Sequence, residues 1–225
     1  MSLVKQVQDW DSRRKQKVAE RLLADGLSDR KAARKFIRWF DHGVFRGLWT
    51  NFHQVAPGVF RSNYPSEKRF SGLVKRGIKT IITLRGADNS VQYQFEKKLC
   101  SENGIGLLAV NLNARRAPSA DNLLQLIALM RLAQQPVLIH CKSGADRAGL
   151  ASAIYLMVFE NTAPREASKM LSRKYLHFKS SKTGVLDLLL ESYAEQHDET
   201  GQSFEDWLRN SYDPDALQHA FDAGR

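Results

Sequence analysis

The stretch that decides the fold of this 225-residue chain is VLIHCKSGADRAG, at residues 137–149. A short apolar run ends at His140-Cys141, five residues follow, and Arg147 then opens an apolar helical pattern. This order predicts a buried strand, a tight loop and a helix N-terminus. The backbone N–H groups of such a loop have no helical partner, and the helix dipole adds positive potential. The stretch therefore predicts a loop that binds an anion.

A thiol at the mouth of this loop loses its proton readily, because the N–H groups and a nearby cation stabilise the thiolate. Arg147 supplies the cation, in a planar fork that matches two phosphate oxygens. We therefore expect Cys141 to be a nucleophile and Arg147 to bind the phosphoryl group it attacks. The loop residues expected to bind substrate are Lys142, Ser143, Gly144 and Ala145.

The His-Cys-x5-Arg pattern resembles that of the cysteine-dependent protein tyrosine phosphatases. The string HCKSGADRAG looks most like their compact bacterial branch, which is related to dual-specificity and inositol-phosphate phosphatases. The resemblance extends upstream through residues 59–66 and 77–85 and covers roughly residues 50–195. It implies a phosphomonoesterase that needs no metal or cofactor and forms a phosphocysteine intermediate. It also implies that His140 hydrogen-bonds nearby backbone and keeps the loop in shape.

The general acid that protonates the leaving group is left open by this pattern. In the family it is usually an aspartate on the loop before the catalytic strand, here residues 111–121, whose early positions are asparagines. Asp146, beside Arg147, is our prediction for the acid, as in the myotubularin-like lipid phosphatases. The alternative role of Asp146 is an ion pair that orients the loop. Asp121 is the second candidate for the acid and Asp88 the third.

Ala148 also departs from the family pattern, because many relatives place Ser or Thr after the arginine, where the hydroxyl assists hydrolysis of the phosphocysteine. A catalytically weak pseudophosphatase that binds phosphorylated partners is therefore the alternative function. Arg115 and Arg116 favour a polyanionic substrate, such as an inositol phosphate or a phospholipid head group. Phosphotyrosine in a protein is the other substrate class that the resemblance implies.

The alternation of apolar strands and helices from residue 59 onward predicts an α/β fold, with a mostly parallel central sheet of about four to five strands flanked by helices. Ligands bind such sheets at the carboxyl ends of the strands, where the Cys141 loop lies. Strands are expected at residues 59–61, 80–84, 107–112 and 137–140. Helices are expected at residues 66–75, 90–102, 118–133, 148–159, 164–175, 185–196 and 204–210.

Three segments are predicted: a basic helical N-terminal extension at 1–50, a catalytic domain at 51–197 and an acidic helical tail at 198–225. Within the extension, helices are expected at 4–23 and 29–40. Its aromatic residues are expected to be buried as one cluster: Trp39, Phe40, Phe45 and Trp49.

The charge of the chain is unevenly distributed. The chain carries +10 in total, yet residues 184–225 hold ten acidic and two basic residues. A basic body indicates an anionic substrate or an anionic membrane surface as a partner, with a solvated surface as the alternative. No apolar run long enough to span a membrane and no nucleic-acid-binding motif occurs. Two cysteines form no disulfide framework, so we expect a cytoplasmic protein.

Overall fold

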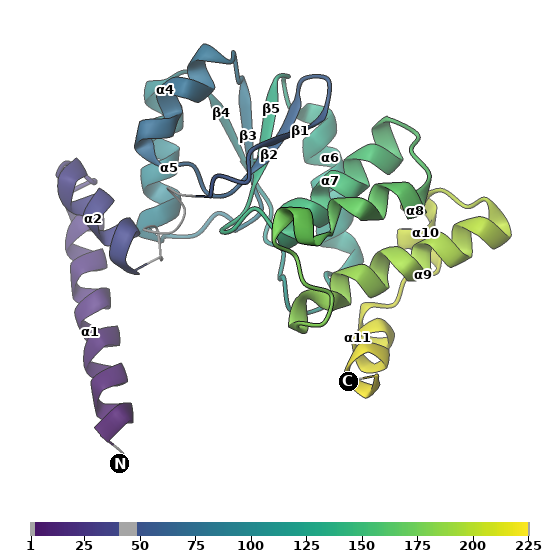
Figure 1. Cartoon of the computed structure of the whole chain (residues 1–225). Coiled ribbons are helices and arrows are strands. Elements are labelled where there is room, and N and C mark those ends of the chain that lie inside the picture. Colours follow the sequence, from purple (N-terminus) through teal and green to yellow (C-terminus); the bar gives the residue numbers. More distant parts are fainter. Residues whose placement is uncertain (1–2, 41–48, 225) are drawn as a thin grey trace.

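A five-stranded sheet forms the centre of the molecule, in the order β1-β2-β5-β3-β4 (Figure 1). A computed structural model describes residues 3–40 and 49–224, and the side chains of 12–39 and 49–224. The strands are β1 (His53–Ala56), β2 (Val59–Ser62), β3 (Thr80–Thr83), β4 (Gly106–Ala109) and β5 (Val137–His140). The pairs β2–β5, β3–β5 and β3–β4 are parallel, and β1 pairs antiparallel with β2 at the edge. The prediction of a mostly parallel sheet is confirmed, although the edge strand β1 was not predicted.

The central strand β5 brings the ends of its neighbours together. His140, its last residue, is in register with Ser62 of β2 and with Thr83 of β3. All four residues of β5 are buried, as expected for a strand covered on both faces. Since parallel strands end at the same edge, the segments after β2, β3 and β5 meet around the Cys141 loop.

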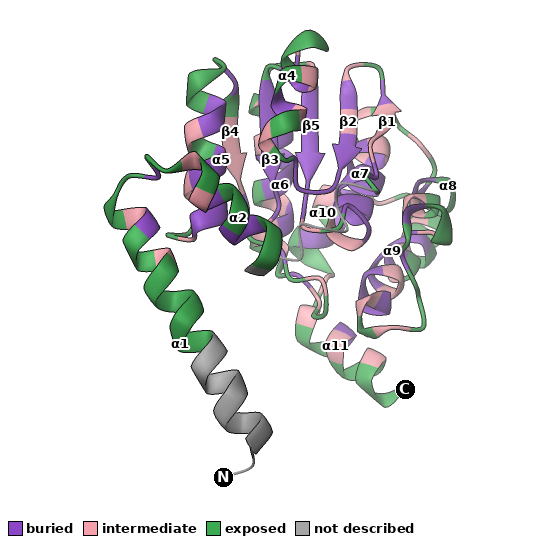
Figure 2. Ribbon diagram, turned by 60° about the vertical axis from the view of Figure 1, so that its left-hand side comes forward, coloured by how far each residue is buried: buried purple, intermediate pink, exposed green. Residues whose placement is uncertain are grey.

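Helices cover both faces of the sheet, and the strands supply alternate side chains to the two cores. Ile82 and Ile139 point into a core shared with α6, α7, α9 and α10, whereas Ile81 and Leu138 point into a core shared with α2, α4 and α5. Figure 2 shows the inner strands β2, β5 and β3 as mainly buried, whereas the edge strands β1 and β4 are mostly intermediate. The longer helices are α1 (Leu3–Ala24), α2 (Arg30–Phe40), α4 (Glu67–Lys75), α5 (Val91–Glu102), α6 (Ala120–Leu132), α7 (Asp146–Phe159), α9 (Val185–Thr200), α10 (Phe204–Asn210) and α11 (Pro214–Ala223).

The two N-terminal helices were predicted and are present, with α2 packed on the body and α1 projecting from it (Figure 1). The apolar face of α2, formed by Ala33, Phe36 and Ile37, is buried in the second core. The prediction that the aromatic residues nearby are buried is wrong for Trp39 and Trp49, which are 63% and 42% exposed. Trp39 is exposed because it lies off the buried face of α2. The side chain of Phe40 and all of Phe45 fall outside the described residues.

No helix in the described parts of the chain combines the length and the apolar character needed to cross a bilayer.

The C-terminal helices α10 and α11 also contribute to the main core. Phe204, Trp207, Leu208 and Leu217 are all buried there. The acidic residues of this segment therefore lie on helices whose apolar side chains pack on the catalytic body.

The prediction of one continuous helix at residues 164–175 is wrong. This segment is broken into the short α8 (Pro164–Ala167) and two 3₁₀ turns, Ser168–Met170 and Arg173–Tyr175. The break has a tertiary cause: the carbonyl of Met170 accepts a hydrogen bond from Arg61 of β2, and Leu176 adopts a left-handed conformation at φ 61°. A third 3₁₀ turn, Lys182–Gly184, leads into α9.

Candidate active site

The Cys141 loop joins β5 to α7 and consists of residues 141–145. Together, β5, this loop and the start of α7 form the strand, loop and helix N-terminus that the sequence predicted. Ala145 occupies the N-cap position and makes no side-chain capping bond to the helix. The first N–H groups of α7 are therefore not occupied by a capping side chain and are placed to bind an anion.

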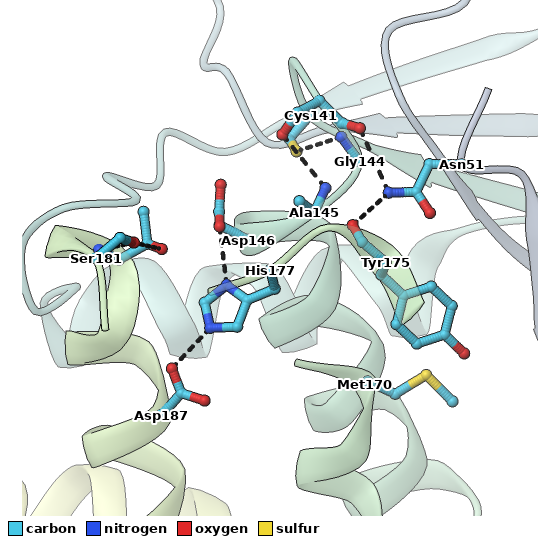
Figure 3. A network of polar contacts seen from close by, with 12 residues as sticks. Asn51, Cys141, Gly144, Ala145, Asp146, Met170, Tyr175, His177, Ser181 and Asp187 are labelled. Atoms are coloured by element: carbon cyan, nitrogen blue, oxygen red, sulfur yellow. Dashed lines mark hydrogen bonds and ion pairs between the residues drawn. The ribbon is translucent and has the colours of Figure 1, made fainter. Parts of the chain in front are cut away.

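Cys141 is buried at the base of this loop. The backbone N–H of Gly144 donates to its Sγ at 3.2 Å (Figure 3). Gly144 has a φ of 74°, and a Cβ there would lie 2.6 Å from the backbone nitrogen of Asn63. Glycine is thus required both by conformation and by the close approach of the segment after β2. These contacts direct a backbone N–H donor at the sulfur of Cys141.

Arg147 lies in the first turn of α7, with its side chain held at the edge of the sheet. Its Nη1 donates to the carbonyls of Leu84 and Leu112, each at 3.2 Å. These carbonyls follow β3 and β4, so the segments after three neighbouring strands converge on one guanidinium. Because only Nη1 makes these bonds, the other two nitrogens of the Arg147 guanidinium can contact phosphate oxygens.

The other predicted binding residues are contiguous with Cys141. Ser143 is exposed, its Oγ accepts from the N–H of Ala145 at 3.3 Å, and its carbonyl lies 3.5 Å from Nδ2 of Asn51. Ala145 is buried, and Lys142 is half-buried with its carbonyl bonded to the N–H of Tyr64. The structure therefore brings together every predicted loop residue in one short turn.

Arg61 is a site residue that reasoning from the loop alone did not identify. It lies on β2, is fully buried, and donates from Nη2 to the carbonyls of Gly144 and Ala145 at 2.7 and 3.0 Å. Its guanidinium also stacks on the ring of Tyr175, 4.0 Å from the centroid. Burial lowers the pKa of Arg61 to about 10, which leaves it charged at neutral pH. By binding two loop carbonyls, Arg61 adds fixed positive charge behind the thiol.

Asp146 is bonded to a histidine that the sequence did not bring to attention. Its Oδ1 lies 2.8 Å from Nδ1 of His177, and Nε2 of His177 lies 2.7 Å from Oδ2 of Asp187 on α9 (Figure 3). Burial lowers the pKa of His177, but hydrogen bonds to the two carboxylates outweigh it and raise that pKa to about 9. His177 is therefore a cation at neutral pH that bridges Asp146 and Asp187, as the ion-pair alternative expects.

The other two candidates for the acid lie on separate elements. Asp121 is exposed in the first turn of α6, where the helix dipole favours a carboxylate. Asp88 is exposed in the segment before α5, and its Oδ1 accepts from the N–H of Ser90 at 3.0 Å. Of the three carboxylates, Asp146 alone lies in the first turn of α7 beside Arg147.

His140 has the role that the resemblance implied. Its Nδ1 lies 3.2 Å from the carbonyl oxygen of Cys141, within the buried base of the loop. On the other side of the ring, Nε2 lies 2.8 Å from Oε1 of Glu96 on α5. Glu96 was not predicted, since a single glutamate within a helical pattern gives no signal in the sequence.

Comparison with known proteins gives one family match over more than half of the chain. The family model described as "DSP-PTPase phosphatase fused to NAD+ Kinase" matches residues 53–185. The inositol diphosphatase DSP4 of Arabidopsis thaliana is 35% identical over 105 residues, which are 44% of this chain and 51% of that protein. The dual specificity protein phosphatase TpbA of Pseudomonas aeruginosa is 24% identical over 124 residues, 55% of this chain and 54% of that protein. The chain thus spans about half the length of these curated relatives.

Solved structures agree with this match in their fold. The crystal structure of P. aeruginosa TpbA has a TM-score of 0.50 at 20% identity and covers 77% of this chain and 91% of that one. A putative phosphatase from Shewanella putrefaciens CN-32 has a TM-score of 0.54 at 17% identity, over 68% of this chain and 95% of that one. Both are structures of the same α/β fold.

The buried bridge made by His177 predicts a pH-dependent stability. The pKa of His177 is near 6.5 when unfolded and about 9 when folded, so its contribution is full below pH 6.5 and is lost as pH rises through 9. We expect His177→Gln to lower the free energy of unfolding by about 3 kcal/mol at pH 6. The difference from wild type should shrink by pH 9.5, as measured by urea denaturation. His219→Gln, a matched change at an exposed histidine of α11, should have little effect at either pH. A pH-independent difference for His177→Gln would contradict the charged bridge.

Proposed function

The chain belongs to the family of dual-specificity-type, cysteine-dependent phosphatase domains, and from that premise we propose that it hydrolyses phosphomonoesters through a phosphocysteine intermediate. The observation that carries the proposal is the N–H of Gly144 directed at Sγ of Cys141, in a loop that ends at Arg147 and the N-terminus of α7. A thiolate, a bidentate cation and free amide donors in one turn are what phosphoryl transfer to sulfur requires.

The reaction has two steps. In the first, Sγ of Cys141 attacks phosphorus as the bond to the leaving oxygen breaks, and that oxygen takes a proton from an acid. Arg147 and the amide groups of the loop stabilise the charge on the equatorial oxygens. In the second step, water attacks phosphorus and gives one proton back to the acid, the sulfur–phosphorus bond breaks, and inorganic phosphate and the thiolate are released. Arg61, which binds the loop carbonyls, maintains the direction of the amide groups throughout.

Asp146 remains our proposal for the acid, acting together with His177. The raised pKa of His177 keeps a proton in this pair up to about pH 9. In this pair the proton starts on His177: Nδ1 would pass it to Asp146, 2.8 Å away, as Asp146 protonates the leaving oxygen, leaving a neutral ring that still donates to Asp187. An isolated exposed carboxylate such as Asp121 has no comparable proton supply among its described contacts.

A polyanionic phosphate, such as an inositol phosphate, is the substrate class that we propose. Arg115 and Arg116 are exposed in the loop that follows Leu112, whose carbonyl binds Arg147. Two cations thus lie three and four residues beyond a contact of the phosphate-binding arginine, where further phosphates of the substrate could bind. A curated relative named as an inositol diphosphatase supports the same class.

The pseudophosphatase alternative is favoured by one feature, the fully buried Ala148. This residue supplies no hydroxyl beside Arg147, so the second step has no side-chain assistance from that position. The Cys141→Ser experiment below distinguishes a pseudophosphatase from an active phosphatase.

Replacing Cys141 tests the proposed chemistry directly. We expect wild type to hydrolyse p-nitrophenyl phosphate in the presence of EDTA, and Cys141→Ser to lower kcat by at least ~10³-fold, because the nucleophile is lost. Cys100→Ser is the matched control: the Cys100 thiol is buried on α5, and this variant should retain activity. Folded wild type without turnover, but with measurable binding of vanadate, would favour the pseudophosphatase.

A pH–rate comparison tests the acid. A required acid makes kcat/KM fall at high pH, so Asp146→Asn should remove that high-pH decline, whereas Asp121→Asn should keep it. On an alkyl phosphate, whose leaving group needs protonation, Asp146→Asn should be about 10²-fold slower than wild type. On p-nitrophenyl phosphate its loss should be much smaller. Retention of the high-pH decline in Asp146→Asn would eliminate this residue as the acid.

The substrate class is tested by removing the two exposed arginines together. Arg115→Gln/Arg116→Gln should raise KM for an inositol polyphosphate about tenfold and leave KM for p-nitrophenyl phosphate unchanged. Arg13→Gln/Lys17→Gln removes the same charge from the projecting α1 and serves as the control. Equal effects of the two double variants would indicate long-range charge alone, and efficient turnover of a phosphotyrosine peptide instead would move the assignment to proteins.

A further inference from the structure

A buried ion pair lies directly behind the catalytic loop. His140 ends β5 and is fully buried, and Glu96 on α5 is 1% exposed. Nε2 of the histidine and Oε1 of the glutamate are 2.8 Å apart, close enough for an ion pair, although within the described residues neither atom makes a hydrogen bond. Charged side chains are almost never buried this deeply unless they are paired, so each accounts for the presence of the other.

The contacts of His140 fix how many protons the pair holds. Nδ1 lies 3.2 Å from the carbonyl oxygen of Cys141, and a carbonyl only accepts, so Nδ1 carries a hydrogen. Nε2 and the carboxylate oxygen, at 2.8 Å, would repel each other through their lone pairs if neither group carried a proton, so the pair holds a second one. That proton is either on His140, giving an imidazolium and a carboxylate, or on Glu96, giving two neutral groups. In water imidazole is the stronger base of the two by about two pKa units, which favours the imidazolium.

We propose that Glu96 is a positioning residue that keeps the second proton on His140, so that the imidazolium stabilises the thiolate of Cys141. His140 is bonded to the backbone of Cys141, whereas the carboxylate lies on the far side of the ring. The positive end of the pair is therefore the end nearer to the sulfur, and the pair favours the thiolate even though its net charge is zero. The inference rests on Cys141 being the proposed nucleophile.

Each of the other ionisable groups around the pair has a constant charge state near neutral pH. The ring of Tyr64 packs against His140 at right angles, 5.7 Å between centroids, and its hydroxyl donates to the carbonyl of Gln92. Arg85, a permanent cation, lies over the ring of Tyr64. On α5, burial and the negative charge of Glu96 raise the pKa of the Cys100 thiol and of Tyr93, so both stay neutral.

On the opposite side of the thiol, Arg61, Arg147 and Asp146 complete the charged surroundings. Arg61, with a pKa of about 10, remains a cation, and Asp146 is bonded to His177. His140 is the described side chain that contacts both Glu96 and the backbone of Cys141.

The test is the ionisation of Cys141 in Glu96→Gln, made in a Cys100→Ser background so that Cys141 is the single thiol. The amide keeps the shape of the side chain and can donate to a neutral His140, so the loop can retain its bonds. The ultraviolet absorbance of the thiolate, with the matching Cys141→Ser protein as the blank, gives the midpoint of ionisation. We expect it to rise by about one pH unit, a roughly tenfold loss of thiolate below the midpoint. Glu102→Gln, the same change on the exposed end of α5 where Glu102 pairs with Arg30, should leave the midpoint unchanged.

An unchanged midpoint in folded Glu96→Gln would overturn the proposal, because the proton would then belong to the glutamate and the ring would be neutral. If Glu96→Gln does not fold, the ¹⁵N chemical shifts of the His140 ring in wild type decide the question. Two protonated ring nitrogens support the imidazolium, and one unprotonated nitrogen overturns it. Neither measurement depends on turnover, so an inactive wild type with a shifted midpoint would refute the proposed function and leave this inference intact.

Discussion

The site depends on one constraint: the loop that directs the N–H of Gly144 at the thiol also turns the carbonyls of Gly144 and Ala145 into the protein, where they need donors. Arg61 meets this constraint by taking the carbonyls of Gly144 and Ala145 with one amino group. A guanidinium can do this within a buried site because it has several fixed donors, and its stacking on Tyr175 replaces part of its lost hydration. The close approach of Gly144 to Asn63 depends on the same packing between β2 and the loop.

Two buried histidines hold the loop from opposite sides of the sheet. His140 connects the start of the loop to Glu96 on α5, and His177 connects its end to Asp187 on α9. His177, a cation at neutral pH, lies between two carboxylates, which is the arrangement under which buried charge is tolerated. The catalytic turn is thus fixed by polar contacts to both helical layers, while its own sequence stays short and glycine-containing.

The strand, loop and helix could be read from the sequence because their signals are local. The apolar run, Gly144 and the spacing of Cys141 and Arg147 all lie within residues 137–149, and the structure places them in one turn. The helix expected at residues 164–175 failed for the opposite reason. Its apolar pattern is helical, but the carbonyl of Met170 binds Arg61, far away in the chain, and the backbone turns to allow that contact. Trp39 likewise belongs to a helix that was predicted correctly, yet its exposure depends on which face of α2 meets the body.

By itself the sequence determined the α/β alternation and the strand, turn and helix start that carry Cys141 and Arg147. Each of these follows from periodicity or spacing over a few residues, which the chain cannot satisfy in another way. Only the tertiary structure decided which distant side chains complete the site. Arg61, Glu96 and Asp187 come from three separate elements and His177 from the segment before α9, and nothing in their local sequence marks them. They meet at the loop because the parallel strands end at one edge and the helices close over both faces, bringing residues far apart in sequence within hydrogen-bonding distance.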